Sequence, residues 1–392
     1  MRAAVFYGPG NIANEEVHCD FRYTPKEIPR SDARREEGDV LLKVKACAVC
    51  GYDVRVYRNG HYKVAPPIIL GHEICGQINK DVVVDTLDSD GKHTTGYRIR
   101  AGSRLAVSPI IPCLSCVYCS YRQYNLCLNL KEIGSSINGG FAEFIKIPKE
   151  VLKIGGLVPV PDKLGDEEAA LLEPLACCLN GFHHMSPLIR KNEQGSVAII
   201  GDGPIGLLHL QLVRNMCDIN TVVIGRISQR LQEAKSLGAN ATVKFASDAD
   251  FDQSLENTLA LTNGVGFNVI IVATSNPVAL KLALKIASKN SRINIFAGMP
   301  KSTDTFFSLD PNFLHYNQIS ITGSFSSTPS TLMEAVKLAS SGEINLSKLV
   351  SHAYHLEDII QAILATEKYH GLRTVINRFQ YNRYEQKEAI GL

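Results

Sequence analysis

The strongest limit on the fold comes from the second half of the sequence, where short apolar runs alternate with helical patterns. The apolar runs predict strands at 197–200, 221–224, 241–243, 268–272, 292–296 and 318–322. Helical patterns lie between them at 205–216, 228–237, 253–262 and 277–287. Strands separated by helices of this length are typical of a parallel sheet covered by helices. We therefore predict an α/β protein that contains a doubly wound sheet.

The residues before Pro161 follow another pattern, with short alternating stretches such as 40–46 separated by glycine and proline turns. Alternation of apolar and polar residues favours strands, so a β-rich domain is expected here. The polar stretch 84–100 predicts a hairpin or a loop. A chain of 392 residues is long enough for two domains, since domains typically span about 100–200 residues.

Composition and charge argue against several kinds of function. Hydrophobic residues make up 45% and charged residues 20%, as in ordinary globular proteins. A net charge of +2 without basic clusters argues against nucleic-acid binding. The N-terminus lacks the apolar core of a secretory signal, and no apolar run approaches the roughly 20 residues that cross a bilayer. We expect a cytoplasmic protein that binds neither nucleic acid nor membranes.

A short polar loop carries four cysteines in a C-x2-C-x2-C-x7-C pattern: Cys113, Cys116, Cys119 and Cys127. Four thiolates on one loop can complete a tetrahedral shell around Zn2+, and a complete shell is typical of a structural zinc site. The alternatives are two disulfides or coincidence. Disulfides are disfavoured because nothing in the sequence indicates secretion, and cytosolic thiols stay reduced.

The turn between the first predicted strand and helix has a G-x-G-x-x-G pattern, formed by Gly201, Gly203 and Gly206 with Pro204 and Ile205. Glycines in this context permit a tight turn and a close approach of the backbone to a pyrophosphate, which the helix N-terminus attracts. The pattern predicts a dinucleotide site. We also assign Ala273 and Phe296, at the ends of two later strands, to this site.

The end of the second strand bears on the choice of dinucleotide. An acidic residue here binds the ribose of NAD, but the sequence has Gly225, followed by the basic or polar residues Arg226, Ser228 and Arg230. Guanidinium groups bind phosphate strongly, so this pattern favours NADP(H) over NAD(H). The alternative is that the arginines only solvate the start of a helix.

Three further motifs contain residues that can bind a metal. Cys50 lies between an apolar strand and a glycine turn, His72 and Glu73 lie in another turn, and Glu173 lies in an apolar stretch. An unpaired carboxylate in such a stretch is costly, and a cation would offset that cost. Each residue taken alone is about as often a core cysteine, a hydrogen-bonded histidine or a helix-entry glutamate.

The motifs C-G-x-D, G-H-E and E-P-L occur here in that order, and the chain therefore resembles the zinc-dependent medium-chain dehydrogenases. The resemblance is to the polyol (sorbitol) and threonine dehydrogenase branch, and it covers nearly the whole chain. It implies that Cys50, His72 and Glu173 bind a catalytic zinc, with Glu73 as a nearby group or exchanging ligand. It also implies that Asp53 orients His72. Together with the cysteine loop, this makes two zinc ions per chain.

The resemblance also implies the domain organisation and the activity. Residues 1–175 would form a GroES-like catalytic domain with the structural zinc lobe, 176–322 a Rossmann NADP-binding domain, and 323–392 a part that returns to the catalytic domain. The implied activity is hydride transfer between NADP(H) and an alcohol/carbonyl pair, with a polyol, sugar, aldehyde or secondary alcohol as substrate. Family members commonly form homodimers or homotetramers.

Two positions depart from the family pattern. Tyr52 replaces the usual Ser or Thr after C-G, and Arg55 replaces the histidine common in threonine dehydrogenases. Tyr52 either passes the substrate proton toward the cofactor or only narrows the site. The alternative functions are an NAD-dependent L-threonine 3-dehydrogenase and a non-catalytic protein that binds zinc and nucleotide.

Overall fold

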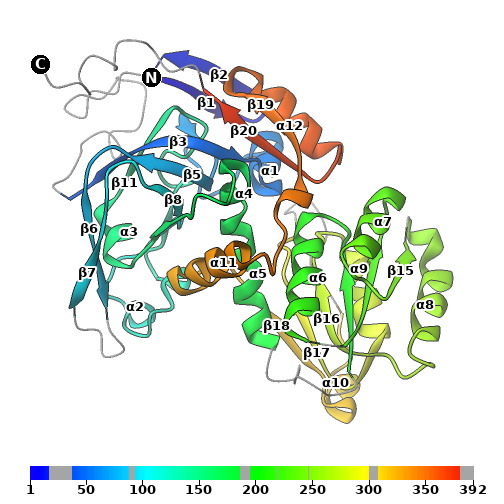
Figure 1. Cartoon of the computed structure of the whole chain (residues 1–392). Helices are drawn as coiled ribbons and strands as arrows, with labels where there is room; N and C mark the ends of the chain where they lie inside the picture. The colour runs from blue at the N-terminus through cyan, green and yellow to red at the C-terminus, as the bar shows by residue number, and fades with distance from the viewer. Residues whose placement is uncertain are drawn as a thin grey trace, which may run out of the picture. The chain divides into compact units, whose positions relative to one another are not determined.

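The computed structural model describes residues 1–16, 38–87, 93–185, 195–217, 219–245, 247–299 and 308–379. The chain forms two compact units (Figure 1). The first contains Met1–Ala176, Ser327–Ser340 and Leu346–Leu392, and the second contains Cys177–Ser326 and Ser341–Asn345. The short segment 341–345 therefore joins the second unit, whereas the sequence analysis assigned it to the returning C-terminal part.

The first unit is built around a seven-stranded sheet with the order β12-β8-β5-β3-β20-β19, in which β11 also pairs with β3. Its strands are β3 (Val40–Ala48), β5 (Glu73–Ile78), β8 (Arg104–Val107), β11 (Phe144–Ile147), β12 (Leu157–Pro159), β19 (Val350–His355) and β20 (Arg373–Arg378). Val375 and Ile376 of β20 pair antiparallel with Ala48 and Cys47 of β3. Figure 1 shows this pairing as the red arrow of β20 near the blue arrow of β3. Both ends of the chain thus contribute to one sheet.

Smaller sheets and helices complete the first unit. The additional strands are β1 (Arg2–Gly8), β2 (Asn11–Glu16), β4 (Ile68–Ile69), β6 (Val82–Leu87), β7 (His93–Ile99), β9 (Ile110–Ile111) and β10 (Lys131–Glu132). The helices are α1 (Gly51–Asn59), α2 (Val117–Ser120), α3 (Lys149–Lys153), α4 (Asp166–Ala170), α11 (Pro329–Ser341), α12 (Ile359–Glu367) and the first part of α5 (Leu172–Met185). Strands β6 and β7 form an antiparallel hairpin within the stretch predicted as a hairpin or loop; residues 88–92 lie outside the described residues.

The second unit contains a six-stranded parallel sheet with the order β15-β14-β13-β16-β17-β18. Its strands are β13 (Ser196–Ile200), β14 (Asn220–Gly225), β15 (Ala241–Lys244), β16 (Phe267–Val272), β17 (Ala287–Ile295) and β18 (Ser320–Gly323). Its helices include α6 (Pro204–Met216), α7 (Ser228–Ser236), α8 (Phe251–Ala260), α9 (Pro277–Lys285) and α10 (Pro311–Asn317). The strand order reverses next to β13, which is typical of a doubly wound sheet. The predicted α/β class is confirmed.

The largest departure from the predicted boundaries is at β17. The sequence predicted a helix to 287 and a strand from 292, but α9 ends at Lys285 and β17 begins at Ala287. Residues 288–291 are polar, so they do not show the apolar pattern of a buried strand. Asn290 adopts a φ of 57°, and the register against β16 shifts between Phe267 and Val269. An irregular strand start therefore escaped the pattern analysis.

The core of each unit follows from its strand patterns. Strand β13 has the sequence SVAII, and its last four residues are buried, as expected for a parallel strand covered on both faces. Strand β3 alternates buried and partly buried residues from Val40 to Lys45 and is then buried to its end. No helix within the described residues is both long and apolar enough to span a bilayer.

Candidate active site

Antiparallel pairing brings Cys50 and the His72–Glu73 pair together. Cys50 follows β3 and precedes α1, while Glu73 is the first residue of β5. Ala48 of β3 is the register partner of Glu73. The end of β3 and the start of β5 therefore meet at one edge of the sheet, and residues more than twenty positions apart become neighbours.

The three side chains form a group that can bind a metal. Ligand atoms of Cys50, His72 and Glu73 all lie within 4.8 Å of one another. Glu73 is 1% exposed, and neither carboxylate oxygen accepts a hydrogen bond of good geometry from the described residues. A buried carboxylate needs positive charge nearby; the guanidinium of Arg373, 2.8 Å from Glu73 Oε1, supplies part of it, and a metal ion would supply more. The sulfur, nitrogen and oxygen donors suit Zn2+, and three protein ligands leave the fourth position open for substrate, as in catalytic zinc sites.

Asp53 contacts the residues of this cluster through both of its carboxylate oxygens. Its side chain is fully buried; Oδ2 accepts a hydrogen bond from the Cys50 N–H at 2.9 Å, and Oδ1 accepts one from the Gly71 N–H at 3.3 Å. His72 Nδ1 lies 3.7 Å from Asp53 Oδ1. Burial lowers the pKa of His72, but the charge of Asp53 and the contact with Cys50 outweigh it and raise the pKa well above its usual value. The pocket therefore attracts positive charge.

Gly71 determines the backbone conformation of the turn that carries His72. Its φ is 90°, and a Cβ at this position would lie 2.8 Å from Cys47 Sγ and 3.0 Å from the Phe141 ring. Only glycine fits both the backbone conformation and the space.

Arg373 is a member of the cluster that the sequence analysis missed. It is 4% exposed, and its Nη2 lies 2.8 Å from Glu73 Oε1, while Nη1 donates to the Val49 carbonyl at 2.9 Å. Arg373 starts β20, which pairs with β3, so it reaches the same sheet edge as Cys50 and Glu73. The only signal in the sequence was a charged residue at the head of the apolar run TVI, more than three hundred residues from Cys50.

Glu173 belongs to the set of zinc ligands that the resemblance implies. It lies in the first turn of α5 and is 6% exposed, and its charge acts on both His72 and Arg373. It is not in the group of ligand atoms within 4.8 Å, whereas Glu73 is. The geometry therefore favours Glu73 over Glu173 as the third metal ligand, with Glu173 close by.

Tyr52 lies beside the cluster, and its ring makes a T-shaped contact with that of His72. The two ring centroids are 5.7 Å apart, and the Tyr52 hydroxyl is 3.2 Å from His61 Nδ1. Burial, followed by the charge of Glu132, raises the pKa of Tyr52 well above its usual value. The protein alone therefore shifts this phenol away from ionisation at neutral pH, opposite to the shift that favours a proton relay.

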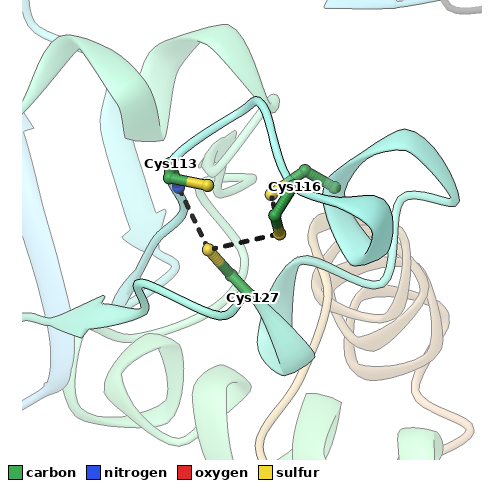
Figure 2. A group of neighbouring side chains, drawn as sticks. Cys113, Cys116 and Cys127 are labelled. Carbon is green, nitrogen blue, oxygen red and sulfur yellow. Dashed lines mark hydrogen bonds between the residues drawn. The ribbon is translucent and has the colours of Figure 1, made fainter.

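The four cysteines of the loop converge, as predicted from their spacing. Figure 2 shows Cys113, Cys116 and Cys127 of this group. Cys116 Sγ lies 3.5 Å from Cys119 Sγ and 3.9 Å from Cys127 Sγ, and all four sulfurs lie within 4.8 Å of one another. Sulfurs bound about 2.3 Å from a tetrahedral zinc are about 3.8 Å apart. All four thiols are free, so the disulfide alternative finds no support.

The lobe around these cysteines has a small apolar core. Besides Cys119 and Cys127, its buried members are Ile110, Tyr124 and Ile154. The hydroxyl and amide of Ser115 lower the pKa of Cys113 to about 5, and the amides of Leu128 and Cys119 lower that of Cys116. Burial raises the pKa values of Cys119 and Cys127. Cys113 and Cys116 are thus shifted toward the thiolate form, and a bound metal would favour deprotonation of all four cysteines.

The second unit carries the glycine loop between β13 and α6. Gly201 has a φ of 131°, and a Cβ on Gly206 would lie 1.8 Å from the Gly201 carbonyl oxygen, so helix and loop pack too closely for a side chain. A Cβ on Gly203 would have open space, with only Arg230 Nη1 near it at 3.8 Å. Pro204 and Ile205 open α6, and Ala273 and Phe296 follow β16 and β17 at the same edge of the sheet. This cradle fits a dinucleotide pyrophosphate.

Gly225 ends β14 beside this cradle. Arg226 is exposed, Ser228 starts α7, and Arg230 is 7% exposed with its guanidinium near Gly203. The structure thus brings the predicted cofactor residues to one edge of the sheet. It also brings Asp202 there, which the sequence analysis treated only as a spacer in the glycine motif.

Comparison with known proteins agrees with this geometry. Residues 36–162 match the alcohol dehydrogenase GroES-like domain family, and residues 204–341 match the zinc-binding dehydrogenase family. The chain is 30% identical over 344 residues to a sorbitol dehydrogenase of Halalkalibacterium halodurans, covering 86% of this chain and 91% of that protein. It is 29% identical over 351 residues to an L-threonine 3-dehydrogenase of Bacillus velezensis, covering 88% and 92%.

Two solved structures are similar over nearly the full chain. One is a zinc-binding dehydrogenase of Sinorhizobium meliloti 1021 bound to NADP, with 27% identity, a TM-score of 0.78 and coverage of 96% of this chain and 98% of that one. The other is the alcohol dehydrogenase rspB of Escherichia coli CFT073 complexed with NADH, with 25% identity, a TM-score of 0.76 and coverage of 96% and 99%. The chain is therefore an enzyme of the zinc-dependent medium-chain dehydrogenase family, in the branch that includes the polyol dehydrogenases.

Proposed function

We propose that this enzyme transfers a hydride between NADP(H) and an alcohol/carbonyl pair, with a polyol, sugar or secondary alcohol as substrate. The observation that carries the proposal is the group of the partly buried Cys50 and His72 with the buried Glu73, whose ligand atoms lie within 4.8 Å of one another. Three such ligands leave one coordination position for the substrate oxygen.

The two bound groups would supply the chemistry. Zinc is a Lewis acid that stabilises negative charge on the substrate oxygen, and the nicotinamide ring accepts or donates the hydride. Cys50, His72 and Glu73 would hold the metal. Asp53 accepts from the Cys50 amide at 2.9 Å and faces His72 Nδ1 at 3.7 Å, which orients the imidazole.

Arg373 balances the negative charge of this site. A thiolate and two carboxylates would make the pocket strongly anionic, and the buried guanidinium 2.8 Å from Glu73 offsets part of that charge. Glu173, in the first turn of α5, is placed to act on the metal site through its charge or through an exchange with Glu73. Both residues would therefore tune the affinity for zinc rather than take part in hydride transfer.

The preference for NADP(H) is supported by Arg226 and Arg230 beside the glycine loop. Gly201, Gly203 and Gly206 permit close approach of the pyrophosphate, and the N-terminus of α6 favours its negative charge. A guanidinium near the adenosine ribose favours a 2′-phosphate.

The four-cysteine lobe would hold a second zinc with a structural role. Its complete shell leaves no position for substrate, and its small apolar core needs a further source of stability. Four reduced thiols agree with a cytoplasmic location. Strand β18 is an edge of the parallel sheet, and an edge strand can pair with a second copy, which supports a homodimer or homotetramer.

L-threonine 3-dehydrogenase is the second candidate, because a relative of that name matches most of the chain. Arg55 stands where that branch tends to have histidine, which favours the polyol proposal. A non-catalytic role is less favoured, because the three side chains proposed to bind the catalytic zinc lie close enough together to do so.

A screen of polyols, sugars, aldehydes, secondary alcohols and L-threonine tests the proposal, with the absorbance of reduced nicotinamide as the readout. We expect turnover with at least one alcohol or its carbonyl, and faster turnover with NADP(H). Activity on L-threonine with NAD(H) alone would favour the second candidate. Absence of turnover across the panel by a zinc-loaded protein would contradict the proposal.

A further inference from the structure

Asp202, the second residue of the glycine loop, occupies the space that a side chain at position 225 would take. A Cβ added to Gly225 would lie 2.4 Å from Asp202 Cβ and 2.6 Å from Asp202 Oδ2. Gly225 does not have a positive φ, so the backbone conformation there is open to any residue. Glycine is therefore required at the end of β14 for space, because the Asp202 side chain lies across it.

The Asp202 carboxylate is fixed in this position. The residue is 8% exposed, and its Oδ2 accepts a hydrogen bond from the Ile227 N–H at 2.6 Å. Ile227 precedes α7, so the carboxylate joins the glycine loop to the turn that follows β14. Within the described residues, Oδ1 has no hydrogen-bond donor, which leaves it able to accept one from a ligand.

This geometry changes what Gly225 implies about the cofactor. In dinucleotide-binding folds, a carboxylate at the end of the second strand accepts a hydrogen bond from the ribose 2′-hydroxyl of NAD. Gly225 has no side chain, so the strand itself provides no carboxylate. The Asp202 carboxylate lies there instead, with Oδ2 2.6 Å from the place that a Cβ of residue 225 would occupy. A negative charge there binds a ribose hydroxyl and repels a 2′-phosphate.

We propose that Asp202 replaces the strand-end acid and accepts a hydrogen bond from the adenosine ribose. Its negative charge then opposes the effect of Arg226 and Arg230 on cofactor choice. Asp202 favours NAD(H), the arginines favour NADP(H), and the enzyme accepts both dinucleotides with a ratio set by this balance. The inference rests on the dinucleotide part of the proposed function and does not depend on the alcohol substrate or on zinc.

The Asp202→Asn variant separates charge from structure. The asparagine Oδ1 can still accept from the Ile227 N–H, so the turn after β14 keeps its hydrogen bond, while the negative charge is lost. Binding of NADH and NADPH to the purified full chain is measured by nicotinamide fluorescence without substrate. We expect the ratio of the Kd for NADH to the Kd for NADPH to rise by roughly ten- to hundredfold, the usual effect of losing a charge-assisted hydrogen bond.

A second variant moves the carboxylate instead of removing it. Asp202→Gly combined with Gly225→Asp returns the acid to the strand end, and the glycine removes the Cβ that would lie 2.4 Å from the new Cβ at position 225. This double variant is expected to bring the Kd ratio back to within about threefold of the parent, whereas Asp202→Gly alone raises it as Asp202→Asn does. Asp252→Asn is the matched control, because it removes the same charge from an exposed position on α8.

Parallel changes in both Kd values, or an unchanged ratio, would show that Asp202 only holds the turn and would overturn the proposal. A failure of the double variant to recover NADH binding would count against it as well. A parent protein that binds neither dinucleotide would overturn both this inference and the proposed function. A parent that binds them but oxidises no alcohol would contradict the proposed function alone, because the Kd ratios still test Asp202.

Discussion

The two groups of metal-binding side chains in the first unit are assembled in different ways. The cysteine cluster comes from one loop, residues 113–127, with a small apolar core of its own. The Cys50 cluster needs the ends of β3 and β5 and the start of β20, and it includes Arg373 from the far end of the chain. The first cluster is confined to one lobe, and the second is held in place by the sheet. We therefore expect changes in the first to act on stability and changes in the second to act on turnover.

His72→Ala in the sheet-built cluster should have the largest effect. It removes a zinc ligand from the open site, and metal stabilisation of the transition state contributes several kcal/mol, so kcat/KM should fall by at least about a thousandfold. Steady-state kinetics on the preferred substrate measure this. His370→Ala, at an exposed histidine of the same unit, is the control. A loss below tenfold would mean that this cluster is not the catalytic one.

The third ligand can be identified by comparing Glu73→Gln with Glu173→Gln. Glu73 is in the group of ligand atoms and Glu173 is outside it, so Glu73→Gln should weaken zinc binding at the open site about tenfold or more beyond the effect of Glu173→Gln. Competition with a chromogenic chelator measures both affinities. Glu73→Gln also leaves Arg373 without its partner, so thermal unfolding of the zinc-free forms is compared as well. The reverse order of zinc affinities would favour the ligand set inferred from the family resemblance.

Cys113→Ser in the loop-built cluster should act mainly on stability. The variant should lose one zinc and unfold several degrees lower, since about 2–4 °C corresponds to 1 kcal/mol in domains of this size. Its kcat should stay within about threefold of the parent at temperatures where it remains folded. Cys177→Ser, at a partly exposed cysteine outside both clusters, is the control. A large fall in kcat without a lower unfolding temperature would remove the functional difference between the two clusters.

The smallest effect is expected for Tyr52→Phe. The hydroxyl is 3.2 Å from His61 Nδ1, and burial raises its pKa, so the residue is expected to shape the pocket rather than transfer a proton. We predict a change in kcat of less than about threefold and an unchanged pH–rate profile, whereas loss of a general acid/base would cost about 100-fold or more. A tenfold fall with loss of one limb of the profile would establish the relay role instead. Parallel measurement of His61→Asn would then identify the next group in the relay.

The predictability of the two clusters from sequence differs for a physical reason. The four cysteines are close in sequence, and their spacing alone limits the geometry, so Cys113 to Cys127 could be assigned before the fold was known. Cys50 and His72–Glu73 could be proposed from motifs, but their contact depends on the register of β3 against β5. Arg373 could not be found, because no local pattern links the start of β20 to a site formed from residues 50 to 73.

In the second unit, the role of one residue, Gly225, could likewise not be predicted from the sequence. The parallel sheet and most of its boundaries followed from periodicity, since buried parallel strands form continuous apolar runs. The significance of Gly225 did not, because the reason for the glycine is the Asp202 side chain on another loop. The sequence around Asp202 does not show that its side chain occupies the space beside Gly225, because the two residues become neighbours only in the fold. The sequence therefore singled out the end of β14, but not the Asp202 carboxylate that lies beside it.

Zinc content measured together with turnover tests the central claim most directly. The claim is that an open zinc site at Cys50, His72 and Glu73 carries the oxidoreductase activity, separate from the cysteine lobe. We predict about two zinc ions per chain in the parent, and about one in Cys50→Ser, which should retain NADPH binding and lose turnover on every alcohol of the panel. A Cys50→Ser protein that keeps both the parent's zinc content and its turnover would contradict the account.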